Sequence, residues 1–268
     1  MNSEINKAIG MKNYRGAALA LLLILHGLWS IPAHAVDDEI QVYIDDMNKP
    51  GEFGVETHVN YVLEGEEQAS YADGSPSHHM LQMTPEFSYG ITPNWEAGMY
   101  VPVAYEENGN LYGNGLRLRM KYIATPAEAS NMFWGMNVEY GYSAPRVAES
   151  AWGMELRPIL GYHDDVWLLS FNPILNMDMS ENFNHTPQFE PALKVSHKVN
   201  ESLQAGLEYY GEYGYTNELL PQERRINYLY AAFDYEKDDF EVNFGIGRGD
   251  GNASDKWIAK AIFAFPFK

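Results

Sequence analysis

The 268-residue sequence contains no cysteine. We therefore expect no disulfide bond and no lipid-modified cysteine of the kind that anchors a lipoprotein. Lysine and arginine are also scarce, 18 against 37 aspartate and glutamate, so the formal net charge is −19. Because phosphate binding depends on lysine and arginine, this balance excludes nucleic acid as an expected partner. The acidic excess indicates solvated loops or, as an alternative, a lumen that favours cations.

Long apolar runs are missing once the first 35 residues are set aside. Three basic residues precede an apolar stretch at 17–29, and residues 33–35 read Ala-His-Ala. The apolar stretch is shorter than the about 20 residues that a spanning helix needs, and the small residues fit a cleavage site. We therefore interpret residues 1–35 as a cleavable signal peptide and expect the mature chain to begin at Val36.

Aromatic residues and glycine are abundant, with 14% aromatics, 19 Tyr and 23 Gly. After residue 52, stretches of roughly ten residues alternate apolar side chains with polar or small ones. The last stretch, DKWIAKAIFAFPF, places Trp257 and Phe265 on one face and Lys260 on the other, because successive strand residues point to opposite faces. An aromatic outer face with a mixed inner face is typical of a strand in a transmembrane β-barrel.

Twelve such strands are predicted, each near the about 9–11 residues that a tilted spanning strand requires. They cover 53–63, 80–91, 95–105, 115–124, 132–142, 151–162, 166–177, 187–197, 202–213, 225–235, 239–248 and 256–267. Five short connections alternate with six long ones, which is the pattern of periplasmic turns and external loops in outer-membrane barrels.

The sequence thus predicts an all-β protein, a single antiparallel outer-membrane barrel of about twelve strands over 53–268, in a Gram-negative cell envelope. A periplasmic N-terminal leader at 36–52 precedes the barrel, and both termini are periplasmic. The alternative is a soluble β-sandwich or lipocalin-like barrel, which would bury its apolar face inward. The continuous aromatic face and the charged opposite face favour the membrane barrel.

The stretch 116–122 gives the sharpest indication of a lumen, because Arg117, Arg119 and Lys121 occupy every second position. A cation on the lipid face costs about 2–4 kcal/mol at the midplane, so these three side chains are predicted to point inward. Glu96 and Glu139, on the two flanking strands, are predicted to pair with them across the sheet. The same alternation predicts a solute path lined by Glu86, Glu96, Arg117, Arg119, Lys121, Glu139, Glu155, Arg157, Asn172, Glu190 and Lys194. This lining either only stiffens the barrel or also selects solutes.

Proline occurs inside five predicted strands, at Pro85, Pro102, Pro158, Pro173 and Pro191. Because proline removes a hydrogen-bond donor from the ladder, we expect bulges or kinks at these positions. They would set the curvature of the barrel, narrow its lumen or open a lateral gap.

Four phrases of the sequence, TPEFSYGIT, WEAGMYVPV, MELRPILGY and QFEPALKV, resemble outer-membrane β-barrel proteins of the phenol-degradation MetA-pathway type. The resemblance spans most of residues 53–267. Members of that group are described as transporters, so the resemblance implies a small aromatic or hydrophobic solute. It carries over no binding residue.

We expect the protein to be a porin-like transport protein through which a small solute diffuses passively, with no enzymatic activity, cofactor or bound metal. Its expected partners are outer-membrane lipid and the solute, and the oligomeric state stays open. The alternative is a non-conducting structural or adhesion barrel, which a lumen closed by side chains would favour.

A lipid-modifying enzyme is the third reading, and it needs a Ser–His or Asp–His arrangement at the outer rim. Ser77-His78-His79 lies in the first long loop but lacks a recognisable nucleophile pattern. The same His pair with its acidic neighbours is a weak metal candidate, because adjacent histidines lack the spacing of a helical metal site. His58, alone on its lumen face, is predicted to be a hydrogen-bonded lining residue.

Overall fold

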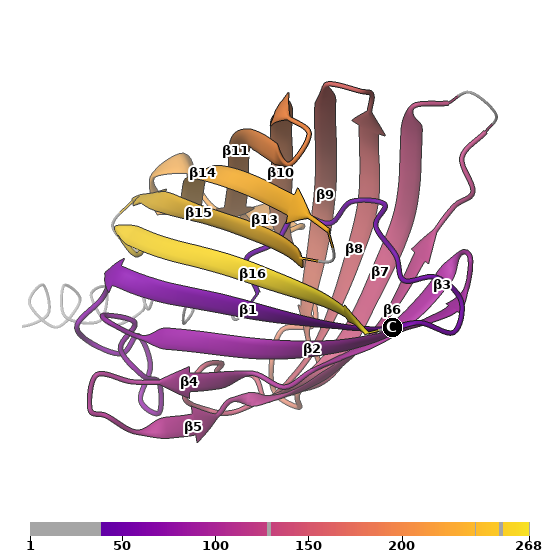
Figure 1. Cartoon of the computed structure of the whole chain (residues 1–268). Helices are drawn as coiled ribbons and strands as arrows, with labels where there is room; N and C mark the ends of the chain where they lie inside the picture. Colours follow the sequence, from indigo (N-terminus) through magenta and orange to yellow (C-terminus); the bar gives the residue numbers. More distant parts are fainter. Residues whose placement is uncertain (1–38, 128–129, 239, 252–253, 268) are drawn as a thin grey trace, which may run out of the picture. The chain divides into compact units, whose positions relative to one another are not determined.

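A computed structural model describes residues 39–127, 130–238, 240–251 and 254–267, and the predicted signal peptide lies outside these ranges. Twelve long antiparallel strands close into a barrel in the described ranges, because β1 pairs with both β2 and β16 (Figure 1). The strands are β1 (Phe53–Glu64), β2 (Leu81–Thr92), β3 (Trp95–Tyr100) continued by β4 (Val103–Tyr105), β6 (Gly115–Ile123), β7 (Met132–Ser143), β8 (Trp152–His163), β9 (Trp167–Asp178), β10 (Gln188–Asn200), β11 (Leu203–Glu212), β14 (Ile226–Lys237), β15 (Phe240–Asp250) and β16 (Trp257–Phe267).

The all-β barrel prediction is therefore confirmed, and every predicted strand is present within a few residues of its predicted ends. The exception is the third strand, which the structure divides into β3 and β4 around Val101 and Pro102. Among the described residues, no helix is both long and apolar enough to cross a membrane.

Connections differ in length between the two ends of the barrel. Pro93 and Asn94 alone join β2 to β3, and we call this the tight-turn end. The opposite, long-loop end carries the short strands β5 (Leu111–Gly113), β12 (Gly214–Tyr215) and β13 (Glu218–Leu219), and the 3-10 helix η2 (Gln222–Arg224). At the tight-turn end the Asp164 carboxylate accepts the backbone N–H groups of Val166 (2.8 Å) and Trp167 (2.7 Å), which fixes the β8–β9 turn.

Burial alternates along the strands as period two demands. On β6, Leu118 is 57% exposed while the neighbouring Arg119 is 8% exposed. The outward side chains form an apolar and aromatic surface around the barrel, which includes Phe53, Phe87, Trp95, Leu118, Trp134, Trp152, Trp167, Leu207, Phe244 and Trp257. A surface of this kind suits lipid, whereas the polar side chains point into the lumen.

The prolines do not produce the predicted bulges in the described ladders, and Pro85 and Pro191 keep their ladder partners, Thr57 and Pro173. Register shifts occur between Val62 and Glu64 on β1 and in two other strands, away from the prolines. Between β8 and β9, the pairs Leu156–Leu175 and Leu160–Phe171 share one register, but the residues between them make no ladder pair. That register places Pro158 opposite Pro173, and neither has an N–H to donate.

Residues 39–47, which we call the inner segment, run inside the barrel (Figure 1, indigo). Ile40 packs against wall residues Val62, Tyr230 and Ile258, and Val42 packs against Ile174 and Ala192. The inner segment belongs to the predicted leader, residues 36–52. It lies against the inner wall because the apolar side chains of Ile40 and Val42 are buried there among wall residues.

Candidate functional site

Tyr43 anchors the inner segment at the centre of the lumen. Its N–H donates to Asn172 Oδ1 (2.7 Å), and its carbonyl oxygen accepts from Ser170 Oγ (2.6 Å) and Asn172 Nδ2 (3.1 Å). Its hydroxyl forms a hydrogen bond with the hydroxyl of Tyr100. A buried backbone outside regular structure needs such partners, so two polar side chains of β9 substitute for a ladder.

Glu39 connects the inner segment to two arginines of the wall. One of its carboxylate oxygens lies 3.6 Å from Arg157 Nη1, and the other lies 3.6 Å from Arg117 Nη2. Arg157 also donates to Glu155 (2.6 Å), and Arg117 lies 3.6 Å from Glu139. Arg157 and Arg117 each pair with one wall carboxylate, and the two arginines share the carboxylate of Glu39.

The segment is held a second time near the tight-turn end. Lys121 Nζ donates to the carbonyl (2.7 Å) and the carboxylate (2.5 Å) of Asp46. Asn48 donates from its backbone N–H to Glu96 Oε2 (2.7 Å) and from its side chain to Ser88 Oγ (2.8 Å). His163 Nε2 lies 3.2 Å from an oxygen of Asp45. All of these contacts are polar and non-covalent, and none of them belongs to a ladder between barrel strands.

Two further ion-pair clusters line the wall. In the first cluster, the Glu208 carboxylate forms ion pairs with Lys260 and Lys194. Lys260 also donates to the carbonyl oxygen of Ile40 (3.0 Å), and Lys194 also donates to the Asp234 carboxylate (2.7 Å). In the second cluster, Arg119 binds Glu86 and Glu96, with 2.7 Å between Arg119 Nη2 and Glu96 Oε1.

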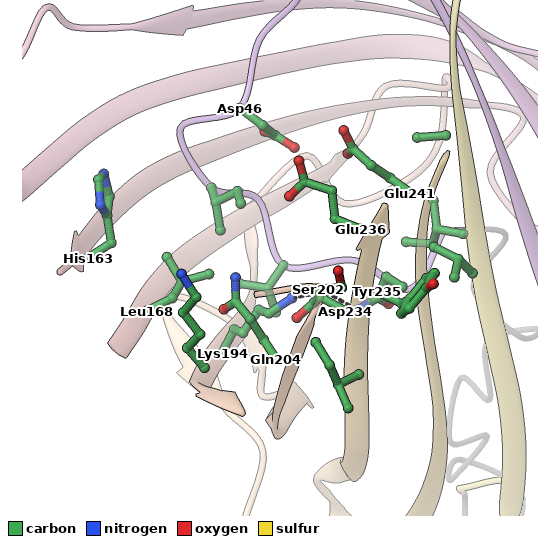
Figure 2. A pocket seen from close by; sticks show the side chains of 18 of the residues that line it. Asp46, His163, Leu168, Lys194, Ser202, Gln204, Asp234, Tyr235, Glu236 and Glu241 are labelled. Atoms are coloured by element: carbon green, nitrogen blue, oxygen red, sulfur yellow. Dashed lines mark hydrogen bonds and ion pairs between the residues drawn. The ribbon is translucent and has the colours of Figure 1, made fainter. Parts of the chain in front are cut away.

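Several cavities lie beside the inner segment. One of about 530 Å³ opens among Asp46, His163, Lys194 and Glu241 at the tight-turn end (Figure 2). Another of about 180 Å³ lies beside Glu86 and Arg119, and one of about 90 Å³ lies between Arg157 and Tyr228. Gln41 of the inner segment lines each of these cavities.

The structure brings most of the predicted lining residues into this one interior network. The residues that pair there, with each other or with the inner segment, are Glu86, Glu96, Arg117, Arg119, Lys121, Glu139, Glu155, Arg157, Asn172 and Lys194. Glu190 lines the smallest cavity and accepts from Asn176 Nδ2 at 3.4 Å. Glu96 and Glu139 both pair across the sheet with a cation of β6, Glu96 with Arg119 and Glu139 with Arg117.

The sequence analysis missed the residues of the inner segment that contact the polar wall, Glu39, Tyr43 and Asp46. The signal that could have found them is the alternation of Ile40, Val42 and Ile44 between acidic residues at both ends. Such a stretch complements a wall with inward Arg and Lys.

The loop cluster named as a possible catalytic rim is arranged differently from a Ser–His pair. Ser77 Oγ donates to Asp255 Oδ1 (2.5 Å), while His78 Nδ1 accepts from the backbone N–H of Gly65 (3.2 Å). Asp255 Oδ1 also accepts the Glu66 N–H (3.3 Å). This arrangement ties together two long loops and engages the Ser77 hydroxyl with the Asp255 carboxylate and the His78 ring with the Gly65 N–H.

These features define a closed twelve-stranded β-barrel whose polar lumen holds its own N-terminal segment. The fold is similar to that of the COG4313 outer membrane channel from Pseudomonas putida F1, with TM-score 0.59 and 12% identity over 85% of this chain and 100% of that one. It is also similar to the KdgM porin, with TM-score 0.54 and 8% identity over 80% of this chain and 99% of that one. No family model and no curated protein matches the sequence.

Proposed function

We propose that the protein is an outer-membrane channel that passes a small solute by passive diffusion and is closed by its inner segment in this structure. The observation that carries the proposal is the way Tyr43 is held, by side chains of β9 and β3 and not by strand pairing. A plug that is held by side-chain contacts and not by strand pairing can be displaced without opening the barrel wall. The similarity of the fold to known channels supports the same reading.

The predicted lining residues form the solute path in this proposal. Once the inner segment leaves, Glu39 no longer covers Arg117 and Arg157, and Asp46 no longer covers Lys121. Those three cations then face water together with Glu139 and Glu155 and set the selectivity of the pore. Both termini lie in the periplasm, so the segment acts from inside the cell envelope.

The solute is small and aromatic or hydrophobic in this proposal, as the resemblance to MetA-pathway barrels implies. The rings inside the lumen support it. Tyr100 and Tyr230 are fully buried on the wall, and Tyr210 packs edge-to-face on Tyr230 with 5.5 Å between the ring centres. Tyrosine rings offer an apolar face and a hydroxyl, which suits a phenol-like molecule.

A disulfide lock tests the channel. The chain has no cysteine, so Asn48→Cys with Ser88→Cys introduces only one pair, at side chains that meet at 2.8 Å. In planar bilayers the oxidised double variant is expected to stay closed, and reduction is expected to restore discrete conductance steps equal to those of the wild type. Each single-cysteine variant is the control, since it should conduct under both conditions. Equal conductance of the oxidised and reduced double variant would overturn the role of the segment.

A non-conducting structural barrel is the second candidate, and the position of the inner segment inside the lumen favours it. Glu39 and Tyr43 lie among the wall side chains, beside cavities of about 90 Å³ and 180 Å³. A folded protein, identified by its shift in gel mobility on heating, that shows no conductance with or without the inner segment would establish this reading and end the channel proposal.

A further inference from the structure

Two carboxylates and one histidine meet on the inner wall where β1 pairs with β2. Glu56 lies directly opposite Glu86 in the register, and His58 is two residues along β1 on the same face. One donor atom from each of the three side chains lies within 4.8 Å of the others. His58 Nε2 is 3.3 Å from Glu86 Oε2, and the His58 side chain is completely buried.

We propose that Glu56, His58 and Glu86 bind a divalent transition-metal ion of the Zn²⁺ class. Zinc takes nitrogen at about 2.0–2.1 Å and carboxylate oxygen at about 2.0–2.2 Å in tetrahedral geometry. Two ligands at these lengths are separated by roughly 3.3–3.5 Å. The His58–Glu86 separation already has this value, and Glu56 completes a set of three ligands with one position left for water.

The charges of the cluster call for an additional cation. Glu56, Glu86 and Glu96 contribute three carboxylates, while Arg119 is the cation that Glu86 and Glu96 share. In the described ranges, no hydrogen bond or ion pair involves the Glu56 carboxylate. His58 Nδ1 is buried without a hydrogen-bond partner. A dication compensates the second and third carboxylates, and imidazole with carboxylate ligands favours zinc-like ions over the all-oxygen sites of calcium.

An acidic entrance leads to the cluster. Glu56 and Asp46 both line the 530 Å³ cavity and the 180 Å³ cavity, so the site opens on both. In Figure 2 the carboxylates of Asp46, Glu236 and Glu241 gather around the larger cavity. Converging carboxylates in a low-dielectric mouth raise the local concentration of cations. The site belongs to the barrel wall, so it exists whether or not the barrel conducts.

Calorimetric titration of the refolded, EDTA-treated protein with ZnCl₂ tests the site. The wild type is expected to bind one equivalent that Glu56→Gln weakens by about 100-fold or more. Glu56→Gln is the informative variant because that carboxylate makes no pair whose loss would unfold the barrel. Glu241→Gln is the matched control from the same cavity and should keep the stoichiometry. A heat-mobility shift verifies folding of each protein.

A second pair of variants distinguishes zinc binding by the loop histidines from zinc binding by the proposed ligands. His78→Ala with His79→Ala should retain the tight equivalent, whereas His58→Gln should lose it. Titration with Co²⁺ adds an optical readout, because a site with nitrogen and oxygen ligands gives visible absorption that Glu56→Gln should abolish. Folded wild type without tight Zn²⁺ binding, or tight binding that survives Glu56→Gln or disappears with the loop histidines, would overturn the assignment.

Discussion

The guanidinium of Arg157 lies 4.3 Å from the centre of the Tyr43 ring, and the Lys121 ammonium lies 5.0 Å from the same ring. Two wall cations therefore hold one aromatic side chain of the inner segment. Each such contact contributes ~0.5–2 kcal/mol, with the larger values for desolvated pairs. The Tyr43 ring is consequently the point at which the lumen is most easily unlocked.

Tyr43→Leu is expected to weaken the seating of the inner segment by about 1–3 kcal/mol, since both cation contacts disappear. The ratio of open to closed protein then rises by roughly 5- to 150-fold. Single-channel recording measures the change. Tyr43→Phe is the matched control, because it keeps the ring and loses only the hydrogen bond to Tyr100. A larger effect of Tyr43→Phe than of Tyr43→Leu would contradict the cation contacts as the main hold.

The strands and the direction of their side chains could be read from the sequence, but the contents of the barrel could not. Period two places Arg117, Arg119 and Lys121 inside because cations on the lipid face are too costly. The pairing of Lys121 with Asp46 joins residues 75 positions apart and involves no repeating pattern. A short segment that packs through individual contacts leaves only a local trace in the sequence.

The proposed metal ligands show a second limit of prediction from the sequence, which is the register between strands. Glu56 opposes Glu86 only in one register of β1 against β2, and a shift by a single residue would turn one of them outward. The long connection between β1 and β2 does not fix that register, unlike a two-residue hairpin. His58 therefore stood alone in the sequence analysis, although the fold places it beside Glu86.

Arg119→Gln is expected to destabilise the barrel by about 3–5 kcal/mol, because Glu86 and Glu96 are left buried without their cation. Adding Glu86→Gln and Glu96→Gln should recover most of this loss, since the two carboxylates that Arg119 neutralised are then uncharged. Urea unfolding followed by tryptophan fluorescence measures both. Arg248→Gln, at an exposed arginine 5.7 Å from the Trp257 ring, should cost less than about 1 kcal/mol. Equal losses for Arg119→Gln and Arg248→Gln would refute the buried-pair argument.

On the outer apolar surface, the loss of stability caused by an introduced charge is expected to depend on the depth of the residue in the bilayer. Leu118→Arg, in the middle of β6, is expected to destabilise the barrel folded in lipid vesicles by about 2–4 kcal/mol. Leu219→Arg is the matched control, because Leu219 is similarly exposed (49% against 57%) but lies in the β12–β13 hairpin at the long-loop end. It should change the same quantity by about 0–1 kcal/mol. Similar costs at both positions would place the lipid boundary elsewhere.

The gap in the β8–β9 ladder beside Pro158 and Pro173 offers a route through the wall as an alternative to the barrel axis. Leu156→Cys with Leu175→Cys joins two residues that face each other at its edge. For an axial route, oxidation of this pair leaves solute uptake into vesicles unchanged, and this is the expected result. Each single variant controls for the loss of a leucine. Uptake that stops on oxidation and returns on reduction would show a lateral route.

The buried Asp255 carboxyl at the long-loop end is expected to make the stability of the barrel depend on pH. Burial raises the pKa of the Asp255 carboxyl, against the opposing effect of the Ser77 hydroxyl and the Glu66 N–H. Because the pKa is higher in the folded state than in the unfolded state, ionisation of Asp255 costs stability above the folded pKa. That cost fades as the pH falls and is absent below the unfolded pKa of about 3.9.

Asp255→Asn removes this titration while keeping an oxygen that can accept from Ser77. The variant is therefore expected to equal the wild type near pH 4 and to be the more stable protein near pH 7, in urea unfolding measured across that range. Asp164→Asn gives the opposite sign, because the Trp167 and Val166 N–H groups hold the pKa of the Asp164 carboxyl below its usual range. The wild type is therefore expected to be more stable than Asp164→Asn at neutral pH, and this difference in stability is lost in acid. A wild type that exceeds Asp255→Asn in stability at pH 7 would show that the Ser77 hydrogen bond outweighs the cost of burying the charge.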